Sequence, residues 1–378
     1  MSSSSQLRPV LPTRRLSGRA LGVAAALAAM LLGTGCPPPK TARYQRDQAQ
    51  KSLARLGQPG VVLGEFNITK VLDGDTIRVD GLDSSLRLEG IDTEETFKNQ
   101  YDLRGADTDF DEYMSEKRKG RHPVKAATPL GEEAKAFAKE FFRNHTKVRL
   151  ERDDPKEIRD AYDRYLAYVF VDRGGTWVNY NVEAVRAGMA PYFPKYGYSK
   201  RFHQEFVAAE NEARAAKRGI WDPTKQHYPD YEERRTWWYA RAEFLARYDR
   251  QADNDPNFIV LSNWDAMKRL EEREGQEVSV LGLVADVKLG DRGPTKVMLA
   301  RKRTQSFPLI FFDKDVFATS GVGDWKGEFI VARGVVTSYV NKYTKRKQLQ
   351  IVIDRASQLT LSPVPGLELP ASTIGAAP

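Results

Sequence analysis

Apolar and polar residues alternate along the stretch from Ile68 to Glu95, ITKVLDGDTIRVDGLDSSLRLEGIDTEE. The alternation breaks at Asp73-Gly74 and then resumes, which predicts a strand, a tight turn and a returning strand. A second alternating run, LRLEG, places its leucines on one face and Arg87 on the other. The apolar pattern stops at Asp92. We therefore expect polar side chains to gather where these strands turn or end.

Helical and strand-like periods follow this stretch. Thr128 suits an N-cap and Pro129 the first turn of a helix, after which apolar residues recur at helical spacing. The expected helices and strands are, in order, a helix from Thr128 to Phe142, strands at Val148–Leu150 and Leu166–Val171, and helices at residues 181–188 and Ser199–Gly219. Elements in this order predict a partly open, five-stranded OB-fold barrel over residues 61–225, in a mainly β fold with helices (α+β).

A second module is expected over residues 257–363, after an aromatic and charged helical linker at residues 226–256. Its strand-like runs are Glu277–Val287, Thr295–Ala300, Phe307–Phe312, Glu328–Val340 and Gln348–Ile353. A short interval without strand character separates the third run from the fourth, which is the order of another OB-like five-stranded barrel. The Pro- and Ala-rich tail at residues 364–378 is expected to be disordered.

The segment between Glu95 and Gly131 is rich in charge and breaks the alternation. Its D-x-D-x-D spacing at residues 107–111 is similar to a calcium loop, but no glycine follows and no glutamate closes a twelve-residue frame. We expect a solvated, mobile loop here, with a lid over a substrate cleft as the alternative.

The N-terminal 35 residues have the pattern of an export signal. Arginines precede the apolar run Ala20–Leu32, and small residues then lead to Cys36. The run is too short for a membrane-spanning helix. The segment resembles a bacterial lipoprotein signal, which implies cleavage before Cys36 and lipidation of that residue. The expected location is the bacterial cell envelope, with the chain exported and anchored by lipid to a membrane (the outer membrane or a periplasmic face) through a tether at residues 36–60.

Charge and residue usage narrow the possible chemistry. The formal net charge is +8, and removing the four arginines of the first 35 residues leaves +4, a mild basicity that suits an anionic partner. Cys36 is the only cysteine, so the chain can form no internal disulfide. The four histidines show no metal-ligand spacing.

Asp75 and Asp92 stand just beyond predicted strand turns or ends, where their side chains can converge. Two carboxylates with a nearby carbonyl or hydroxyl suit Ca²⁺, which takes oxygen ligands. Arg87 adds a planar charged fork suited to phosphate, and Arg164 stands at the head of the apolar strand in YDRYLAY. Two arginines, a carboxylate base and a divalent cation are the groups that phosphodiester hydrolysis requires. Each motif alone also has an ordinary interpretation, a hairpin turn or a solvated strand end.

Taken together, these motifs resemble the staphylococcal nuclease (thermonuclease) family. The matching residues are DGDT at 73–76, RLEGIDTEE at 87–95, YDRYLAY at 162–168 and Gly219-Ile220-Trp221. The resemblance implies that Asp75, Asp92 and the Thr93 carbonyl bind calcium, that Glu95 is the general base, and that Arg87 and Arg164 hold the phosphate. The family usually has a proline where this chain has Glu94.

The resemblance also bears on substrate contacts. Tyr192 and Tyr196 lie where the family has tyrosines that contact nucleotide, although both could instead be packing residues. In the second module, the loop before the last strand is basic, with Lys342, Lys345, Arg346 and Lys347 around an aromatic residue. Such a loop can follow a phosphate backbone, or it can simply keep a surface soluble.

The implied function is a calcium-dependent endonuclease that hydrolyses DNA and RNA, with single strands preferred, little sequence preference and 3′-phosphate products. No obligate protein partner is inferred. The alternative is a lipoprotein with two OB-like domains that binds nucleic acid without cleaving it, or that interacts with another component of the cell envelope.

Overall fold

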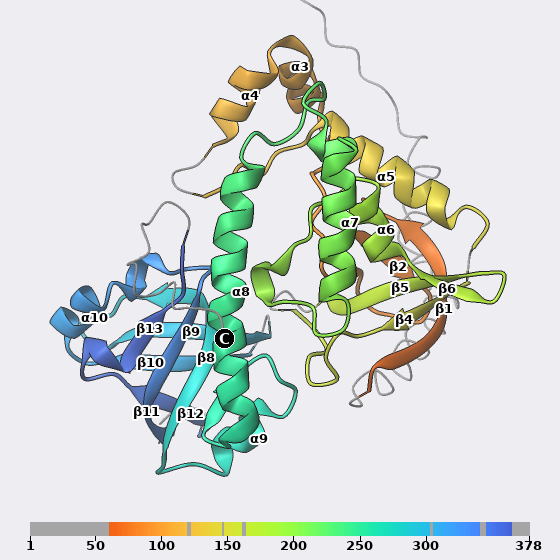
Figure 1. The fold of residues 1–378 in the computed structure, drawn as a ribbon. Helices are drawn as coiled ribbons and strands as arrows, with labels where there is room; N and C mark the ends of the chain where they lie inside the picture. The colour runs from red at the N-terminus through yellow and green to blue at the C-terminus, as the bar shows by residue number, and fades with distance from the viewer. Residues whose placement is uncertain are drawn as a thin grey trace, which may run out of the picture. The chain divides into compact units, whose positions relative to one another are not determined.

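The computed structural model describes residues 60–118, 122–145, 147–160, 164–302, 305–340 and 345–364, and Figure 1 shows the fold. The predicted signal, Cys36, nearly all of the tether and the tail after Val364 lie outside these residues. Within the described part of the chain, no helix is both long enough and apolar enough to cross a bilayer.

The first barrel is built from a six-stranded sheet. Its strands are β1 (Val62–Val71), β2 (Thr76–Val79), β3 (Leu86–Leu88), β4 (Lys147–Glu151), β5 (Tyr165–Arg173) and β6 (Thr176–Asn179). The sheet order is β3-β2-β1-β4-β5-β6, and a parallel pairing of β3 with β5 closes the first five strands. The predicted OB barrel is therefore confirmed, and it is closed rather than partly open.

Alternation along the strands fills the interior of this barrel. Ile77, Leu86 and Leu88 are almost fully buried, while Arg87 lies between the two leucines on the outer face. Five consecutive residues of β5, Ala167–Val171, are buried, because helices cover its outer face as well.

Three α-helices and two 3₁₀ turns complete the first barrel. They are α5 (Pro129–Phe142), α6 (Tyr180–Arg186), η1 (Pro194–Tyr196), α7 (His203–Ala215) and η2 (Gly219–Trp221). The Thr128 hydroxyl accepts a bond from the Gly131 N–H at 3.1 Å and so caps α5 as the sequence predicts. The backbones of Gly188 and Gly219 touch, since a Cβ on Gly188 would lie 2.1 Å from the Arg218 carbonyl oxygen.

The acidic segment after Glu95 is not a solvated loop, and that prediction is wrong. It forms two helices, α3 (Gln100–Thr108) and α4 (Phe110–Lys117). Ala106, Tyr113 and Met114 are buried in a separate apolar cluster with residues that follow α7, including Ile220 and Tyr231. The charged residues lie on the exposed face of each helix. The high density of charge in the sequence therefore led to the prediction of a loop where two amphipathic helices form.

The second barrel repeats the strand order of the first. Its elements are β7 (Phe258–Val260), α9 (Ala266–Glu271), β8 (Glu277–Lys288), β9 (Thr295–Lys302), β10 (Gln305–Phe311), α10 (Lys314–Ser320), η3 (Val322–Asp324), β11 (Phe329–Val340), β12 (Lys347–Val352), η4 (Ala356–Gln358) and β13 (Leu359–Leu361). The circuit β8-β9-β10-β12-β11 closes through a β11–β8 pairing, and β10 runs parallel to β12. This confirms the second closed five-stranded barrel.

Helix α8 (Tyr231–Asn254) connects the two barrels in sequence, and its buried residues include aromatic and charged side chains. The buried Arg241 guanidinium pairs with Glu328. Further along the helix, the Tyr248 hydroxyl donates to the backbone carbonyls of Ser279 at 2.5 Å and Ile259 at 3.2 Å. The helix is therefore fixed to the second barrel by polar as well as apolar contacts.

Candidate active site

One arginine joins the two carboxylates predicted to bind metal. Arg87 Nη2 lies 2.5 Å from Asp92 Oδ1, and Arg87 Nη1 pairs with Asp75. The strand register explains this, since Thr76 lies opposite Arg87 in the β2–β3 pair and Asp75 directly precedes Thr76. Both carboxylates reach one guanidinium, so they are near enough to share a ligand.

Asp75 is held by further bonds at the bottom of the site. It accepts a hydrogen bond from the Thr93 N–H at 3.0 Å and one from the Thr76 hydroxyl at 2.7 Å. Burial alone would raise the pKa of Asp75, but the Arg87 charge and these bonds lower it. The neighbouring Gly74 is required sterically, because a Cβ there would lie 2.6 Å from the Thr93 side chain.

Glu95 lies between two lysines. Its carboxylate oxygens are 3.1 Å from Lys125 Nζ and 3.2 Å from Lys98 Nζ. Partial burial acts to raise the pKa of Glu95, but the two ammonium groups lower it overall. The carboxylate is therefore ionised at neutral pH, as a general base must be.

Arg164 lies at the start of β5, which pairs with β3. Its backbone N–H donates to Asp160 Oδ1 at 2.9 Å, and its guanidinium Nε donates to Asp160 Oδ2 at 2.8 Å. In the β3–β5 register Arg87 lies beside Leu166, which follows Arg164 by two residues. The structure thus places Arg164 directly before the strand that pairs with β3, with its side chain engaged by Asp160.

The two tyrosines assigned to nucleotide contact differ sharply. Tyr192 is fully buried, stacks on Phe206 with ring centroids 4.9 Å apart, and accepts a bond from the Ser199 N–H at 2.9 Å. The prediction that Tyr192 contacts substrate is therefore wrong, because Tyr192 is a core residue whose ring is fully buried. Tyr196 is 52% exposed and packs edge-on against Phe193.

Two further charged groups belong to this site and were missed in the sequence. Burial and the adjacent Asp75 carboxylate raise the pKa of Asp73 to about 6. Asp92 and Glu95 together raise the pKa of Lys125. The DGD motif places Asp73 two residues before Asp75 and could have indicated its place in the site. The sequence around Lys125 gives no such indication, because its partners Asp92 and Glu95 precede it by about 30 residues.

The residues expected to hold calcium offer a suitable donor set, since the Asp75 and Asp92 carboxylates and the Thr93 carbonyl are all oxygen ligands. In the described ranges, no group of three or more His, Cys, Asp or Glu side chains is arranged to hold a metal ion. The fit therefore depends on two carboxylates and backbone oxygen.

The predicted basic loop of the second barrel is partly visible. Lys345, Arg346 and Lys347 are exposed at the start of β12, whereas Lys342 lies outside the described residues. Lys347 Nζ lies 2.5 Å from Glu274. The paired strand β11 ends in Tyr339 and Val340, which are 47% and 54% exposed. Cationic and apolar side chains thus occur together at this hairpin.

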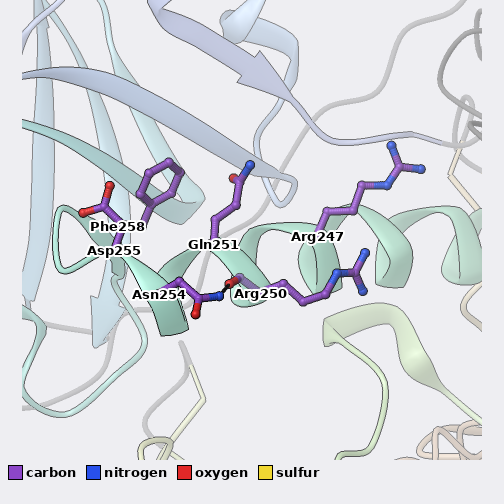
Figure 2. Close-up of a pocket in the computed structure, with 6 residues that line it drawn as sticks. All are labelled: Arg247, Arg250, Gln251, Asn254, Asp255 and Phe258. Carbon is purple, nitrogen blue, oxygen red and sulfur yellow. Dashed lines mark hydrogen bonds between the residues drawn. The ribbon is translucent and has the colours of Figure 1, made fainter. Parts of the chain in front are cut away.

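A surface hollow of about 500 Å³ lies at the C-terminal end of α8 (Figure 2). Its lining includes Arg247, Arg250 and Phe258, and none of the predicted catalytic residues. Both arginines lie 3.3 Å from Glu243, which offsets their charge. The hollow therefore adds nothing to the site at Arg87.

Comparison with known proteins agrees with this geometry. Residues 85–223 match the family described as staphylococcal nuclease homologue. A thermonuclease of Staphylococcus hyicus is 33% identical over 161 residues, which cover 41% of this chain and 75% of that protein. The chain belongs to the staphylococcal nuclease family.

Other relatives extend the comparison. A thermonuclease of Staphylococcus intermedius is 32% identical over 169 residues, covering 43% of this chain and 79% of that protein. Endonuclease YncB of Bacillus subtilis is 31% identical over 161 residues, covering 42% of this chain and 62% of that protein. Family membership and the arginine–carboxylate site together identify this chain as a hydrolase of the nuclease class.

We predict that Lys125→Gln moves the acid limb of the kcat/KM–pH profile to higher pH. Removing the ammonium group takes away a positive charge that favours the ionised Glu95 carboxylate, so the pKa of Glu95 rises. A larger fraction of Glu95 is then protonated, and inactive as a base, at a given acidic pH. The measurement is the pH profile of cleavage, with Lys117→Gln as the control because Lys117 pairs with Asp102 instead. An unchanged acid limb in Lys125→Gln would show that this ion pair does not tune Glu95.

Proposed function

We propose that this protein is a calcium-dependent endonuclease that hydrolyses DNA and RNA with little sequence preference, prefers single strands and leaves 3′-phosphate ends. The observation that carries the proposal is the Arg87 guanidinium shared by Asp75 and Asp92, with an ionised Glu95 three residues after Asp92. A phosphate-binding fork, oxygen ligands and a base are the separate requirements of phosphodiester hydrolysis, and all come from one barrel.

The chain's own residues divide the work. Glu95 accepts a proton from the attacking water while the new P–O bond forms. The bond from phosphorus to the 5′-oxygen breaks, and that oxygen takes up a proton from solvent water. Arg87 and Arg164 bind the phosphoryl oxygens and stabilise the charge that develops on them. Asp75, Asp92 and the Thr93 carbonyl would hold calcium, which would supply positive charge to offset the repulsion between these acids and the substrate.

Substitution at Glu95 tests this assignment. Glu95→Gln should lower kcat by about 10²–10⁴-fold, the usual contribution of a general base, while binding of a non-hydrolysable single strand persists. The measurements are single-turnover cleavage and equilibrium binding, with and without a calcium chelator. Glu140→Gln, an exposed glutamate on α5, is the matched control.

The outcomes of this experiment separate the possibilities. A parent protein that binds strands but never cleaves them would be a nucleic-acid-binding protein, and a parent that does neither would leave an interaction role in the envelope. Cleavage that survives full chelation would remove calcium from the proposal. Cleavage by Glu95→Gln at the parent rate would remove Glu95 from the mechanism.

We also propose that the protein is exported and anchored to a membrane by lipid on Cys36. The support is sequence pattern alone, namely the arginines, the short apolar run and the small residues before the cysteine. Cys36→Ser should therefore release the protein from the membrane fraction or leave its signal uncleaved. Fractionation and the mass of the N-terminal peptide measure this, and no change in either would contradict lipidation.

The basic hairpin of the second barrel is proposed as an accessory contact for the substrate backbone. Its support is the exposure of Lys345, Arg346 and Lys347 beside Tyr339 and Val340. Changing Lys342, Lys345, Arg346 and Lys347 to Gln should weaken binding of long single strands and reduce its salt dependence, with cleavage of a dinucleotide unchanged. Equilibrium binding across a salt series measures this, and an unchanged slope would mean that the cluster only solubilises the surface.

A further inference from the structure

Glu94, the residue beside the general base, is buried and fully engaged. It is 1% exposed, and its carboxylate accepts hydrogen bonds from the Tyr228 N–H and the Tyr231 hydroxyl, both at 2.7 Å. Its second oxygen accepts a bond from the Thr128 hydroxyl, the group that also caps α5. Three donors from two distant parts of the chain therefore meet on one side chain. Such a group fixes backbone position, since displacement would leave buried donors unpaired.

The segment that carries these tyrosines also grips the chain around Lys125. The Tyr228 hydroxyl donates to the Ala126 carbonyl at 2.6 Å and accepts from the Ala126 N–H at 3.1 Å. Two residues earlier, the Val124 N–H donates to Asp230 at 3.2 Å, and the Val124 carbonyl accepts from Arg234.

Alternate residues of this extended segment are thus bound by side chains of residues 228–234. Asp230 and Arg234 are themselves paired at 2.6 Å, so the grip is a closed network. We call Tyr228, Asp230, Tyr231 and Arg234 the clamp. Lys125 lies between Val124 and Ala126, which the clamp holds, and its side chain pairs with Glu95.

The backbone of Glu95 is enclosed by the same contacts. Its carbonyl accepts a bond from the Thr128 N–H at 3.0 Å, and its N–H donates to the Tyr228 hydroxyl at 3.4 Å. Gly131 packs directly against the Glu95 backbone, because a Cβ there would lie 2.0 Å from the Glu95 carbonyl oxygen. The direction of the Glu95 side chain therefore follows from the positions of Glu94, Thr128 and the clamp.

The clamp lies beyond the part of the chain that matches the nuclease family. The match ends at residue 223, whereas the clamp begins at Tyr228 and continues into the first turn of α8. The Glu94 carboxylate, which lies within the matched residues, is thus bound by two donors that follow them.

We propose that Glu94 and the clamp are positioning residues that hold Glu95 in its catalytic orientation, so that the working nuclease extends to at least Arg234. The inference rests on the proposed role of Glu95 as general base. Misplacement of a catalytic group by about 1 Å can lower a rate 10²-fold, and loss of one of three anchoring bonds should have a smaller effect.

The test is Tyr231→Phe in the full chain. The change removes one hydroxyl donor to Glu94 and keeps the ring in its apolar cluster. We expect kcat to fall by about tenfold with KM changed less than twofold, because the loss concerns the reacting geometry rather than ground-state binding. Tyr248→Phe is the matched control, since Tyr248 is a buried tyrosine of the same helix whose hydroxyl bonds backbone carbonyls of the second barrel.

A second background distinguishes positioning from general destabilisation. In Glu95→Gln, adding Tyr231→Phe should lower the residual rate by less than twofold, because the clamp has no base left to orient. Equal tenfold losses in both backgrounds, or an equal loss of kcat in Tyr248→Phe, would overturn the proposal. An unchanged kcat in Tyr231→Phe would also overturn it, provided that the parent cleaves.

Failure of the underlying function has a different signature. If the parent shows no cleavage, or if Glu95→Gln cleaves at the parent rate, the assigned chemistry fails before the clamp is tested. Glu94→Gln gives an independent measurement, since its amide nitrogen cannot accept a bond and at least one of the three present bonds must be lost. It should reproduce the kcat loss of Tyr231→Phe or exceed it, and a parent-like kcat in Glu94→Gln would count against the clamp.

Discussion

The parallel pairing of β3 with β5 is the constraint on which the nuclease site depends. β3 has only three residues, yet it closes the barrel and carries Arg87. Leu86 and Leu88 point inward and are almost fully buried. Because successive side chains of a strand point to opposite faces, Arg87 between them lies on the outer face. The burial of these leucines therefore sets the direction of the arginine. The same pairing brings β5, the strand that directly follows Arg164, alongside β3.

Charge balance is the second constraint. The site contains four acidic residues within one short stretch, Asp73, Asp75, Asp92 and Glu95, whose charges repel a polyanionic substrate. Three cations pair with acids of this group, namely Arg87, Lys98 and Lys125. The arginine and Lys125 are engaged by acids of the protein itself. A phosphate must compete for these cations, which explains why added positive charge suits this site. Burial, and then the charge of the adjacent Asp75 carboxylate, raises the pKa of Asp73 to about 6.

Much of this arrangement could be predicted from local pattern. The five strands of the second barrel begin and end within two residues of their predicted runs. The convergence of Asp75 and Asp92 was predicted from their places beside strand turns or ends, and both contact Arg87. Local pattern failed where the deciding partner is distant. The burial of Tyr192 depends on Phe206, the helical state of α3 and α4 depends on a cluster with Ile220, and the role of Glu94 depends on Tyr231. The charged residues of α3 and α4 lie on one face of each helix, and this becomes evident only because other parts of the chain cover the opposite, apolar face.

The bond between Glu94 and Tyr231 spans 137 residues of sequence. During synthesis the proposed metal ligands, the proposed base and both arginines are all translated before this tyrosine. A growing chain therefore contains all of these groups before it contains the clamp, which is proposed to position Glu95. Closing so long a loop is also among the later and slower events of folding. On the proposal that the clamp orients Glu95, a nascent chain gains its full activity only after Tyr231, at the start of the helix that leads to the second barrel, has been made.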